Sequence, residues 1–285
     1  MLNYRHVFHA GSFVDVHKHI TLRMLLRSLL KKDSAFCYID THAGAGSYDL
    51  QSEYAQKNRE YENGIYRVAA AENPPEEVID YLDAVNAVNP KKVRERGEYR
   101  YYPGSPLIAR QLLRKQDRML LTELHNTEAP LLRKMFNKDK QVSVLHGDAF
   151  VSLKANLPPR ERRGLILIDP PYEVKAEFQS LAMSLIKAWQ KWPTGIFAVW
   201  YPLQKSQPVP QFHYELRAAG VRKVFIHEFY VLPDSQPKRM AGSGMLIINP
   251  PWQFDERITV VLNWLVPVLD QGGGSGPRCE WIVPE

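Results

Sequence analysis

Residues 168–172 read Ile-Asp-Pro-Pro-Tyr and combine hydrogen-bond acceptors with an aromatic ring. The two prolines remove two backbone N–H donors and fix two φ angles, so this strand end offers a rigid set of acceptors. These acceptors are the Asp169 carboxylate and a backbone carbonyl, for which we take Pro170, and the face of Tyr172 follows. Such a set suits a planar base with an exocyclic amino group. A strand closed by a rigid turn is the competing interpretation.

Binding both N–H groups of such an amine would also prepare it to react. Its nitrogen is a poor nucleophile, because the lone pair is delocalised into the ring. Two acceptors favour a pyramidal nitrogen with the lone pair aimed at an electrophilic methyl group. Positioning of this kind can contribute several kcal/mol. We therefore take Asp169, Pro170 and Tyr172 as candidate catalytic residues.

A second motif, Asp-Thr-His-Ala-Gly-Ala-Gly at 40–46, follows an apolar run. Glycines there let the backbone turn tightly and approach a ligand closely. The third glycine of the dinucleotide fingerprint is missing, because Asp49 stands in its place. This counts against a pyrophosphate ligand and leaves room for a nucleoside without phosphates. A strand-to-helix turn that needs small residues is the alternative.

Two further acids close predicted strands. Glu123 is placed to accept hydrogen bonds from ribose hydroxyls, as acids do at this point of nucleotide-binding sheets. It lies 77 residues beyond Gly46, and the spacing becomes ordinary when the 48 residues of a helical insertion are set aside. Asp148, in His-Gly-Asp-Ala at 146–149, could accept from the amino group of an adenine. Taken alone, it reads more simply as a surface turn.

The sequence Ile-Asn-Pro-Pro-Trp at 248–252 has the same shape as the first motif. Asp169 closes the fourth apolar run, which we expect beside the first run in the sheet. Asn249 closes the seventh run, which should be antiparallel and end away from the ligand face. We therefore do not count Asn249 as a site residue.

The elements that position these motifs alternate along the chain. Helix-length segments, such as 106–115 and 176–191, separate most of the apolar runs and predict an α/β fold with a largely parallel sheet. Residues 51–98 carry no strand signal and read as helices, so we predict one α/β domain of 1–50 and 99–285 with a helical insertion at 51–98. The seven predicted strands are 36–40, 119–123, 142–145, 165–169, 196–200, 224–228 and 245–249, and residues 281–283 form a final strand-like run.

Composition narrows the class of protein. The chain has 285 residues, 45% hydrophobic and 24% charged, which is ordinary for a globular protein able to bury a sizeable core. No run approaches the ~18 apolar residues of a membrane span, and no signal peptide opens the chain. The two distant cysteines, Cys37 and Cys279, argue against a zinc site and fit a reducing cytoplasm. The net charge of +6 permits a polyanionic partner.

The basic excess gathers near the start of the chain. Residues 1–32 hold six Lys or Arg against one acid, with four histidines. From Asp15 the pattern predicts an amphipathic helix, whose basic residues, with those of 91–96, would hold the phosphates of a nucleic-acid partner. A solvated helix without such a role is the competing interpretation.

Together, the motifs resemble those of an S-adenosylmethionine-dependent amino-methyltransferase. Over most of the chain, the resemblance is to the bacterial 23S ribosomal RNA adenine-N6-methyltransferase J family. That family methylates adenine 2030 of its RNA, and its fold is a Rossmann-like class I methyltransferase fold, a seven-stranded mostly parallel sheet with a small inserted helical subdomain. The segments that carry the resemblance are Tyr-Arg-His at 4–6, Phe-His-Ala-Gly at 8–11, Asp15, Lys-His at 18–19, residues 40–46, Tyr-Tyr-Pro-Gly-Ser-Pro at 101–106, residues 165–172 and Trp-Ile-Val-Pro-Glu at 281–285.

The resemblance implies S-adenosylmethionine as cofactor, no metal, and 23S rRNA as partner, free of protein or in an early assembly intermediate. We expect a monomer with no membrane association. The N-terminal cluster predicts a segment that closes over cofactor and base, from which we take Tyr4, His6 and Lys18 as catalytic candidates. For His6 and His9, a buried structural histidine is the alternative. The implied cofactor contacts are His19, His42, Ser105, Glu123, Asp148, the adjoining Ala149 and Asp169.

Other functions stay open at this point. A DNA adenine methyltransferase uses the same Asp-Pro-Pro-Tyr chemistry. A glutamine-amide methyltransferase usually has Asn in place of the first acid, so Asp169 argues against it. A catalytically silent rRNA-binding assembly factor is a third possibility, and the intact cofactor motifs disfavour it.

Overall fold

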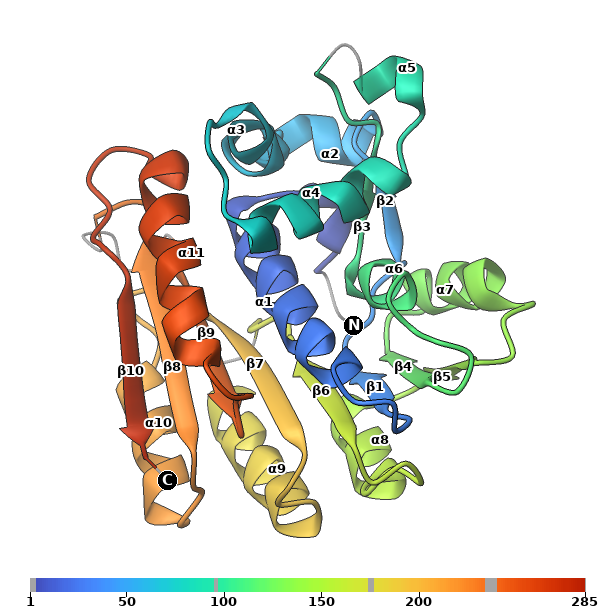
Figure 1. The fold of residues 1–285 in the computed structure, drawn as a ribbon, viewed down its shortest axis with the longest axis vertical. Helices are drawn as coiled ribbons and strands as arrows, with labels where there is room; N and C mark the ends of the chain where they lie inside the picture. Colours follow the sequence, from blue (N-terminus) through green and yellow to red (C-terminus); the bar gives the residue numbers. More distant parts are fainter. Residues whose placement is uncertain (1–3, 95–96, 174–176, 234–239, 285) are drawn as a thin grey trace.

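Eight strands form one sheet in the order β10-β8-β9-β7-β6-β1-β4-β5 (Figure 1). The computed structural model describes residues 4–94, 97–173, 177–233 and 240–284. Neighbours from β5 to β7 pair in parallel, whereas β9 is antiparallel to both β7 and β8, and β10 is antiparallel to β8. The strands are β1 Cys37–Asp40, β4 Arg118–Glu123, β5 Val142–His146, β6 Gly164–Ile168, β7 Ile196–Leu203, β8 Val224–Tyr230, β9 Gly242–Ile248 and β10 Arg278–Val283.

This is the sheet of a class I methyltransferase, and all seven predicted strands are present. The predicted number of seven strands is corrected to eight, because β10 adds a strand at the edge of the sheet. It does so by pairing with β8 from Arg278 to Val283, where the sequence showed only a short strand-like run. The strand order reverses at β1, which lies between β4 and β6. Ligands of such sheets bind at this reversal, beyond the carboxyl ends of the strands.

Helices cover both faces of the sheet, and each face has its own hydrophobic cluster (Figure 1). One cluster joins the sheet to α1 Phe13–Leu30, α6 Ser105–Arg110, α7 Glu128–Phe136 and α11 Phe254–Leu269. The other joins it to α8 Ala149–Asn156, α9 Glu177–Lys191 and α10 Val209–Ala218. The alternation of apolar strands and helices thus buries the sheet on both sides, as a parallel sheet requires.

Helix α1 is far more buried than predicted. Every residue of 13–26 is buried, including the basic side chains Lys18 and Arg23. The helix contacts β6 and β9 of the sheet as well as helices from other parts of the chain, so it has no broad solvent face. The prediction of a solvated amphipathic helix was therefore wrong for residues 13–26, where Lys18 and Arg23 are buried. Arg27, Lys31 and Lys32, at and beyond the end of the helix, are exposed, so contact of these three residues with RNA phosphates stays a prediction.

The helical segment predicted at 51–98 begins and ends beside a small antiparallel ribbon. Its strands, β2 Ser47–Asp49 and β3 Tyr101–Pro103, pair Tyr48 with Tyr102. The division of the chain into two units stays a prediction, because helix α4 belongs to the same hydrophobic cluster as α1. The described elements between the two strands are α2 Glu53–Asn58, η2 Glu60–Asn63, α3 Ile65–Ala70, α4 Glu76–Ala87 and α5 Lys91–Arg94.

Among the described residues, no helix is both long enough and apolar enough to cross a membrane. The chain also has a short 3-10 helix, η1 His6–Phe8, which precedes α1 and carries part of the site. Because η1 contacts α2, the N-terminal residues are held against the helical segment.

Candidate active site

A cavity opens at the carboxyl ends of β1, β4, β5 and β6, where the strand order reverses. The structure brings nearly all predicted site residues to its wall, although they come from distant parts of the chain. Eleven predicted residues line it: Tyr4, His6, Lys18, His19, His42, Ser105, Glu123, Asp148, Ala149, Asp169 and Pro170. We call this space the first cavity.

The glycine motif shapes one wall of the first cavity. Gly44 and Gly46 have φ of +61° and +80°, a backbone region that favours glycine. A Cβ on Gly44 would lie 2.1 Å from the Tyr48 hydroxyl. The Gly44 N–H donates to Glu123 Oε2 at 2.7 Å, and the His125 N–H donates to Oε1 at 2.7 Å. These two bonds fix the carboxylate, and each oxygen keeps a lone pair for a further donor.

Asp148 caps helix α8. Its Oδ1 accepts from the backbone N–H groups of Phe150 and Val151, both at 2.9 Å. The interpretation of Asp148 as a structural turn residue thus has a physical basis. The cap also places Ala149 at the start of the helix and on the cavity wall. The role of Asp148 toward an adenine stays a prediction.

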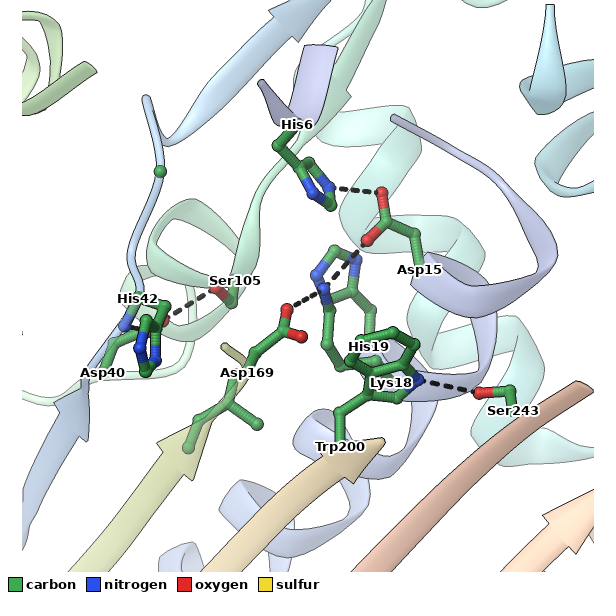
Figure 2. Close-up of polar contacts among 12 residues, drawn as sticks. His6, Asp15, Lys18, His19, Asp40, His42, Ser105, Asp169, Trp200 and Ser243 are labelled. Carbon is green, nitrogen blue, oxygen red and sulfur yellow. Dashed lines mark hydrogen bonds and ion pairs between the residues drawn. The ribbon is translucent and has the colours of Figure 1, made fainter. Parts of the chain in front are cut away.

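Sequence reasoning missed the part played by Asp40, the last residue of β1. Its Oδ2 accepts hydrogen bonds from the hydroxyls of Tyr38 and Ser105, both at 2.7 Å. Figure 2 shows the contact with Ser105. Burial raises its pKa to about 6. Ser105, a predicted cofactor contact, therefore donates its hydroxyl hydrogen to Asp40 and offers a ligand only its oxygen lone pair. An acid at the end of the first strand was the signal that could have found Asp40.

A continuous series of polar contacts runs from Tyr4 to Asp169 of the Asp-Pro-Pro-Tyr motif, and Figure 2 shows its part from His6 onward. Tyr4 Oη contacts His6 Nδ1 at 2.8 Å, and His6 Nε2 contacts Asp15 Oδ2 at 2.9 Å. Lys18 Nζ lies 3.0 Å from Asp15 Oδ1 and also forms an ion pair with Asp169 Oδ2. Asp15, which no prediction assigned to the site, therefore joins two catalytic candidates.

The charges in this chain support one another. Burial alone would raise the pKa of Asp15, but His6 and Lys18 outweigh it and hold that pKa well below its usual range. Burial would likewise lower the pKa of Lys18, but Asp169 and Asp15 outweigh it and raise the pKa. The pKa of His6 is raised, since its contact with Asp15 outweighs burial. Lys18 and Asp15 are therefore both charged at neutral pH.

His9 and His42 have different surroundings. His9 Nδ1 contacts Glu60 Oε1 at 2.8 Å, and its ring stacks on Tyr4 with centroids 5.5 Å apart. His9 is half-buried and follows η1, and Glu60 begins η2. This contact supports a structural role for His9, in which it joins η1 to η2. His42 Nδ1 lies 2.7 Å from Thr41 Oγ1, and burial lowers the pKa of His42 to about 4. His42 is thus neutral at physiological pH.

Tyr172 does not line the first cavity but lines a second one beside it. Its hydroxyl donates to the Trp200 carbonyl at 2.5 Å, and its ring packs against Phe178 with centroids 4.7 Å apart. The second cavity shares Asp169 and Pro170 with the first. Asp169 therefore stands at the boundary between two spaces, and the stacking of Tyr172 on a base stays a prediction.

Trp200 is a further wall of the second cavity that sequence reasoning missed. Its indole Nε1–H donates to Ser243 Oγ at 3.0 Å (Figure 2). Ser243 Oγ also lies 2.8 Å from His17 Nδ1, and His17 Nε2 lies 2.9 Å from His227 Nδ1. The signal was available, because Trp200 ends a predicted strand beside the strand of Asp169.

The similar motif at Asn249 does not join either cavity. Its strand β9 runs antiparallel to its neighbours, as predicted. The Asn249 amide donates to the carbonyls of Pro193 and Gly195, at 2.7 and 2.8 Å.

Three of the predicted RNA-binding residues, Lys18, Arg23 and Arg27, form ion pairs within the protein. Arg23 binds Asp80 through two contacts of 2.6 Å, and Arg27 pairs with the same acid. Lys91 and Lys92 of α5 are exposed, whereas residues 95–96 of that predicted basic run lie outside the described residues.

Comparison with known proteins agrees with this geometry. A family model described as "Ribosomal RNA large subunit methyltransferase D, RlmJ" matches residues 33–283. The chain belongs to this family. Two relatives named "Ribosomal RNA large subunit methyltransferase J" match over the full length of both chains, with 46% identity for Escherichia coli and 43% for Haemophilus influenzae. A Legionella pneumophila protein of known crystal structure has 38% identity and a TM-score of 0.86, over 96% of this chain and 98% of that one.

Membership of this family makes the protein an S-adenosylmethionine-dependent methyltransferase that acts on ribosomal RNA. The described site fits that cofactor in its donors and acceptors. Glu123 and the backbone of the glycine motif suit a ribose. The described wall residues include no cluster of cations that could bind phosphates, since Lys18 is already paired with two carboxylates.

Proposed function

We propose that the protein transfers the methyl group of S-adenosylmethionine to N6 of an adenine in 23S rRNA, with adenine 2030 as the target implied by the family resemblance. The observation that carries this proposal is the boundary position of Asp169 and Pro170 between two adjoining cavities. One cavity would hold the cofactor and the other the base. Methyl transfer needs the two reactants side by side at such a boundary.

In this proposal the first cavity binds the cofactor, which supplies a methyl group on a positively charged sulfur. Glu123 accepts from the ribose hydroxyls, Asp148 accepts from the adenine amino group, and Ala149 contributes a backbone contact. His19, His42 and Ser105 contact the rest of the molecule. Support for this arrangement comes from the shared wall on which these residues lie.

The second cavity receives the target adenine after it leaves its stack in the RNA. Asp169 accepts one N6–H and the Pro170 carbonyl accepts the other. Among the described residues, Lys18 is the partner of Asp169 and holds only its Oδ2. Oδ1 is therefore left as the acceptor for the amine. Tyr172 and Trp200 provide aromatic walls for the base.

The N-terminal residues complete the enclosure. Tyr4 and His6 line both cavities and connect through Asp15 to Lys18. We propose that this segment closes over cofactor and base, with Tyr4, His6 and Lys18 in contact with the reactants or with Asp169. We further propose that the enzyme is a cytoplasmic monomer, and that its substrate is 23S rRNA free of protein or in an early assembly intermediate.

The test is incubation with methyl-labelled S-adenosylmethionine and protein-free 23S rRNA from unmodified ribosomes, followed by mapping of the labelled nucleotide. We expect label on N6 of one adenine. Label on DNA alone would favour the DNA methyltransferase alternative, and cofactor binding without transfer to any RNA would favour a silent assembly factor. Label on a guanine or a cytosine would contradict the proposal.

A further inference from the structure

His19 reaches the first cavity from α1 and is held from behind by two tyrosines. Its Nδ1 lies 2.9 Å from the Tyr102 hydroxyl, which lies 2.9 Å from the Tyr81 hydroxyl. The three side chains are almost completely buried. Tyr102 belongs to β3, and Tyr81 belongs to α4 within the helical segment between β2 and β3. The chain Tyr81–Tyr102–His19 thus connects that segment to the cofactor cavity.

The number of available hydrogens determines which group donates and which accepts in each of these two hydrogen bonds. Its two contacts need two hydrogens, and the two hydroxyl groups supply them if Tyr81 donates to Tyr102 and Tyr102 donates to His19 Nδ1. Among the described residues, Tyr81 has no other hydrogen-bond partner. If His19 Nδ1 also carried a hydrogen, three donor groups would compete for the same two contacts. One buried hydroxyl would then lack an acceptor, which is unfavourable.

The other ring nitrogen therefore carries the hydrogen. No described residue pairs with His19 Nε2, while His19 lines the first cavity. Burial lowers the pKa of His19 to about 3, so the ring is neutral at physiological pH. A neutral imidazole whose Nδ1 accepts a hydrogen bond has its single N–H at Nε2.

We propose that Tyr102 and Tyr81 are positioning residues that hold His19 as a neutral Nε2–H donor for the carboxylate of S-adenosylmethionine. The carboxylate is the only anionic group of the cofactor. His19 belongs to α1, which contacts β6 and β9, whereas the predicted ribose acceptor Glu123 ends β4 and the predicted adenine acceptor Asp148 follows β5. The amino-acid end therefore falls to His19.

A neutral donor suits this place because positive charge is already present. Lys18 precedes His19 on the helix and is protonated, and the cofactor brings a positively charged sulfur. An imidazolium would repel both, whereas a neutral N–H binds the carboxylate without that repulsion. This assignment rests on the use of S-adenosylmethionine and not on the identity of the RNA, so it can be tested without any RNA.

The first test is nitrogen-15 NMR of the histidine rings, with His19 assigned by its loss in His19→Gln. We expect a protonated Nε2 and a bare Nδ1 at neutral pH. In Tyr102→Phe the Nδ1 signal should move toward the average of two tautomers. The matched Tyr66→Phe variant should leave it unchanged, because the Tyr66 hydroxyl bonds the Tyr99 backbone instead. A protonated Nδ1 in the wild type would overturn the proposal.

The second test is calorimetric binding of S-adenosylhomocysteine, which keeps the carboxylate. Tyr102→Phe should raise Kd about tenfold, and Tyr81→Phe about threefold, since Tyr102 still donates to His19 in that variant. At saturating cofactor, kcat should stay within about twofold of wild type, because the bond is made equally in ground and transition states. If Tyr102→Phe does not fold, Tyr81→Phe carries the test. Unchanged Kd in the folded variants would overturn the proposal.

The third test identifies the ligand group by comparing S-adenosylmethionine with its decarboxylated analogue. The wild type should prefer the carboxylated form, and Tyr102→Phe, or Tyr81→Phe in its place, should lose part of that preference. An equal preference in wild type and variant would show that His19 does not bind the carboxylate. A protein that passes these tests and methylates no RNA would contradict the proposed function alone.

Discussion

Two strand ends of this protein carry the same pattern of a polar residue, two prolines and an aromatic. At Asp169 the strand is β6, parallel to its neighbours, and the carboxylate stands between two cavities. At Asn249 the strand is β9, antiparallel, and the amide is bound to two backbone carbonyls. The aromatic of the first motif is packed, whereas Trp252 of the second is 86% exposed.

The difference teaches that strand direction decides what such a motif can do. A parallel sheet gathers the ends of several strands at one edge, so Asp169 shares the first cavity with residues at the ends of β1, β4 and β5. An antiparallel strand sends its last residue to the opposite edge, where the Asn249 side chain bonds the turn after α9 and its backbone N–H bonds the Lys223 carbonyl. One motif therefore places a carboxylate at the boundary of two cavities, and the other has amide donors that close a turn.

Replacement of Asp169 should give the largest effect. Asp169→Ala removes the acceptor for N6 and should lower the rate of transfer on the order of 10³-fold, as loss of a positioned polar group does. Single-turnover transfer to 23S rRNA measures this. The matched variant Asn249→Ala should transfer at the wild-type rate. Wild-type transfer by a folded Asp169→Ala protein would break the comparison.

Asp40, at the end of β1 on the Asp169 side of the sheet, should make the free energy of unfolding depend on pH. Asp40 has a pKa raised by burial to about 6, so the folded state holds its proton more tightly than the unfolded chain does. Stability from this group is therefore present at pH 4 and lost as pH rises to 6. The loss is about 3 kcal/mol at full extent.

Asp40→Asn should abolish that part of the pH dependence. Urea unfolding at pH 4 and pH 7 measures it as the difference between variant and wild type, which removes the contribution of other titrating groups. Parallel curves for the two proteins would mean that Asp40 does not titrate in this range.

Replacement of Asn249 should lower the stability of the fold and leave the rate of methyl transfer unchanged. Asn249→Ala removes two donors from the carbonyls of Pro193 and Gly195 and puts alanine at a φ of +55°. We expect a loss of about 1–3 kcal/mol in the free energy of unfolding, measured in urea. Slower transfer with unchanged stability would place Asn249 in the active site after all.

Replacement of Trp252 should give the smallest effect. The side chain is exposed, so Trp252→Ala should change stability by less than about 0.5 kcal/mol and leave transfer unaffected. Its counterpart, Trp200→Ala, would remove a wall of the second cavity and should raise KM for RNA. A higher KM for Trp252→Ala would indicate that this exposed ring meets the RNA.

Sequence patterns predicted the strand ends well, because a parallel sheet fixes where its carboxyl ends lie. Glu123 and Asp169 could therefore be assigned to one edge of the sheet from the sequence alone. The surroundings of α1 could not, since the partner of Arg23 is Asp80, 57 residues away. Helical periodicity alone does not show that a basic residue is buried against such a distant acid.

The sequence also could not predict which residues support the site residues from outside the predicted motifs. Asp15 and Tyr102 gain their places from contacts among separate elements, and neither stands in a motif with a recognised chemical role. Trp200 could have been found more easily, because it ends the predicted strand 196–200, and that strand pairs in parallel with the strand before Asp169. Strand order, rather than motif, was the clue to it.

The most direct test of the account is a crystal structure with S-adenosylhomocysteine and adenosine monophosphate bound together. We predict that the adenine lies in the second cavity, with N6 about 3 Å from Asp169 Oδ1 and from the Pro170 carbonyl. We also predict that the cofactor sulfur in the first cavity faces N6. An adenine whose N6 points away from Asp169, or one that binds at the Asn249 end, would contradict the account.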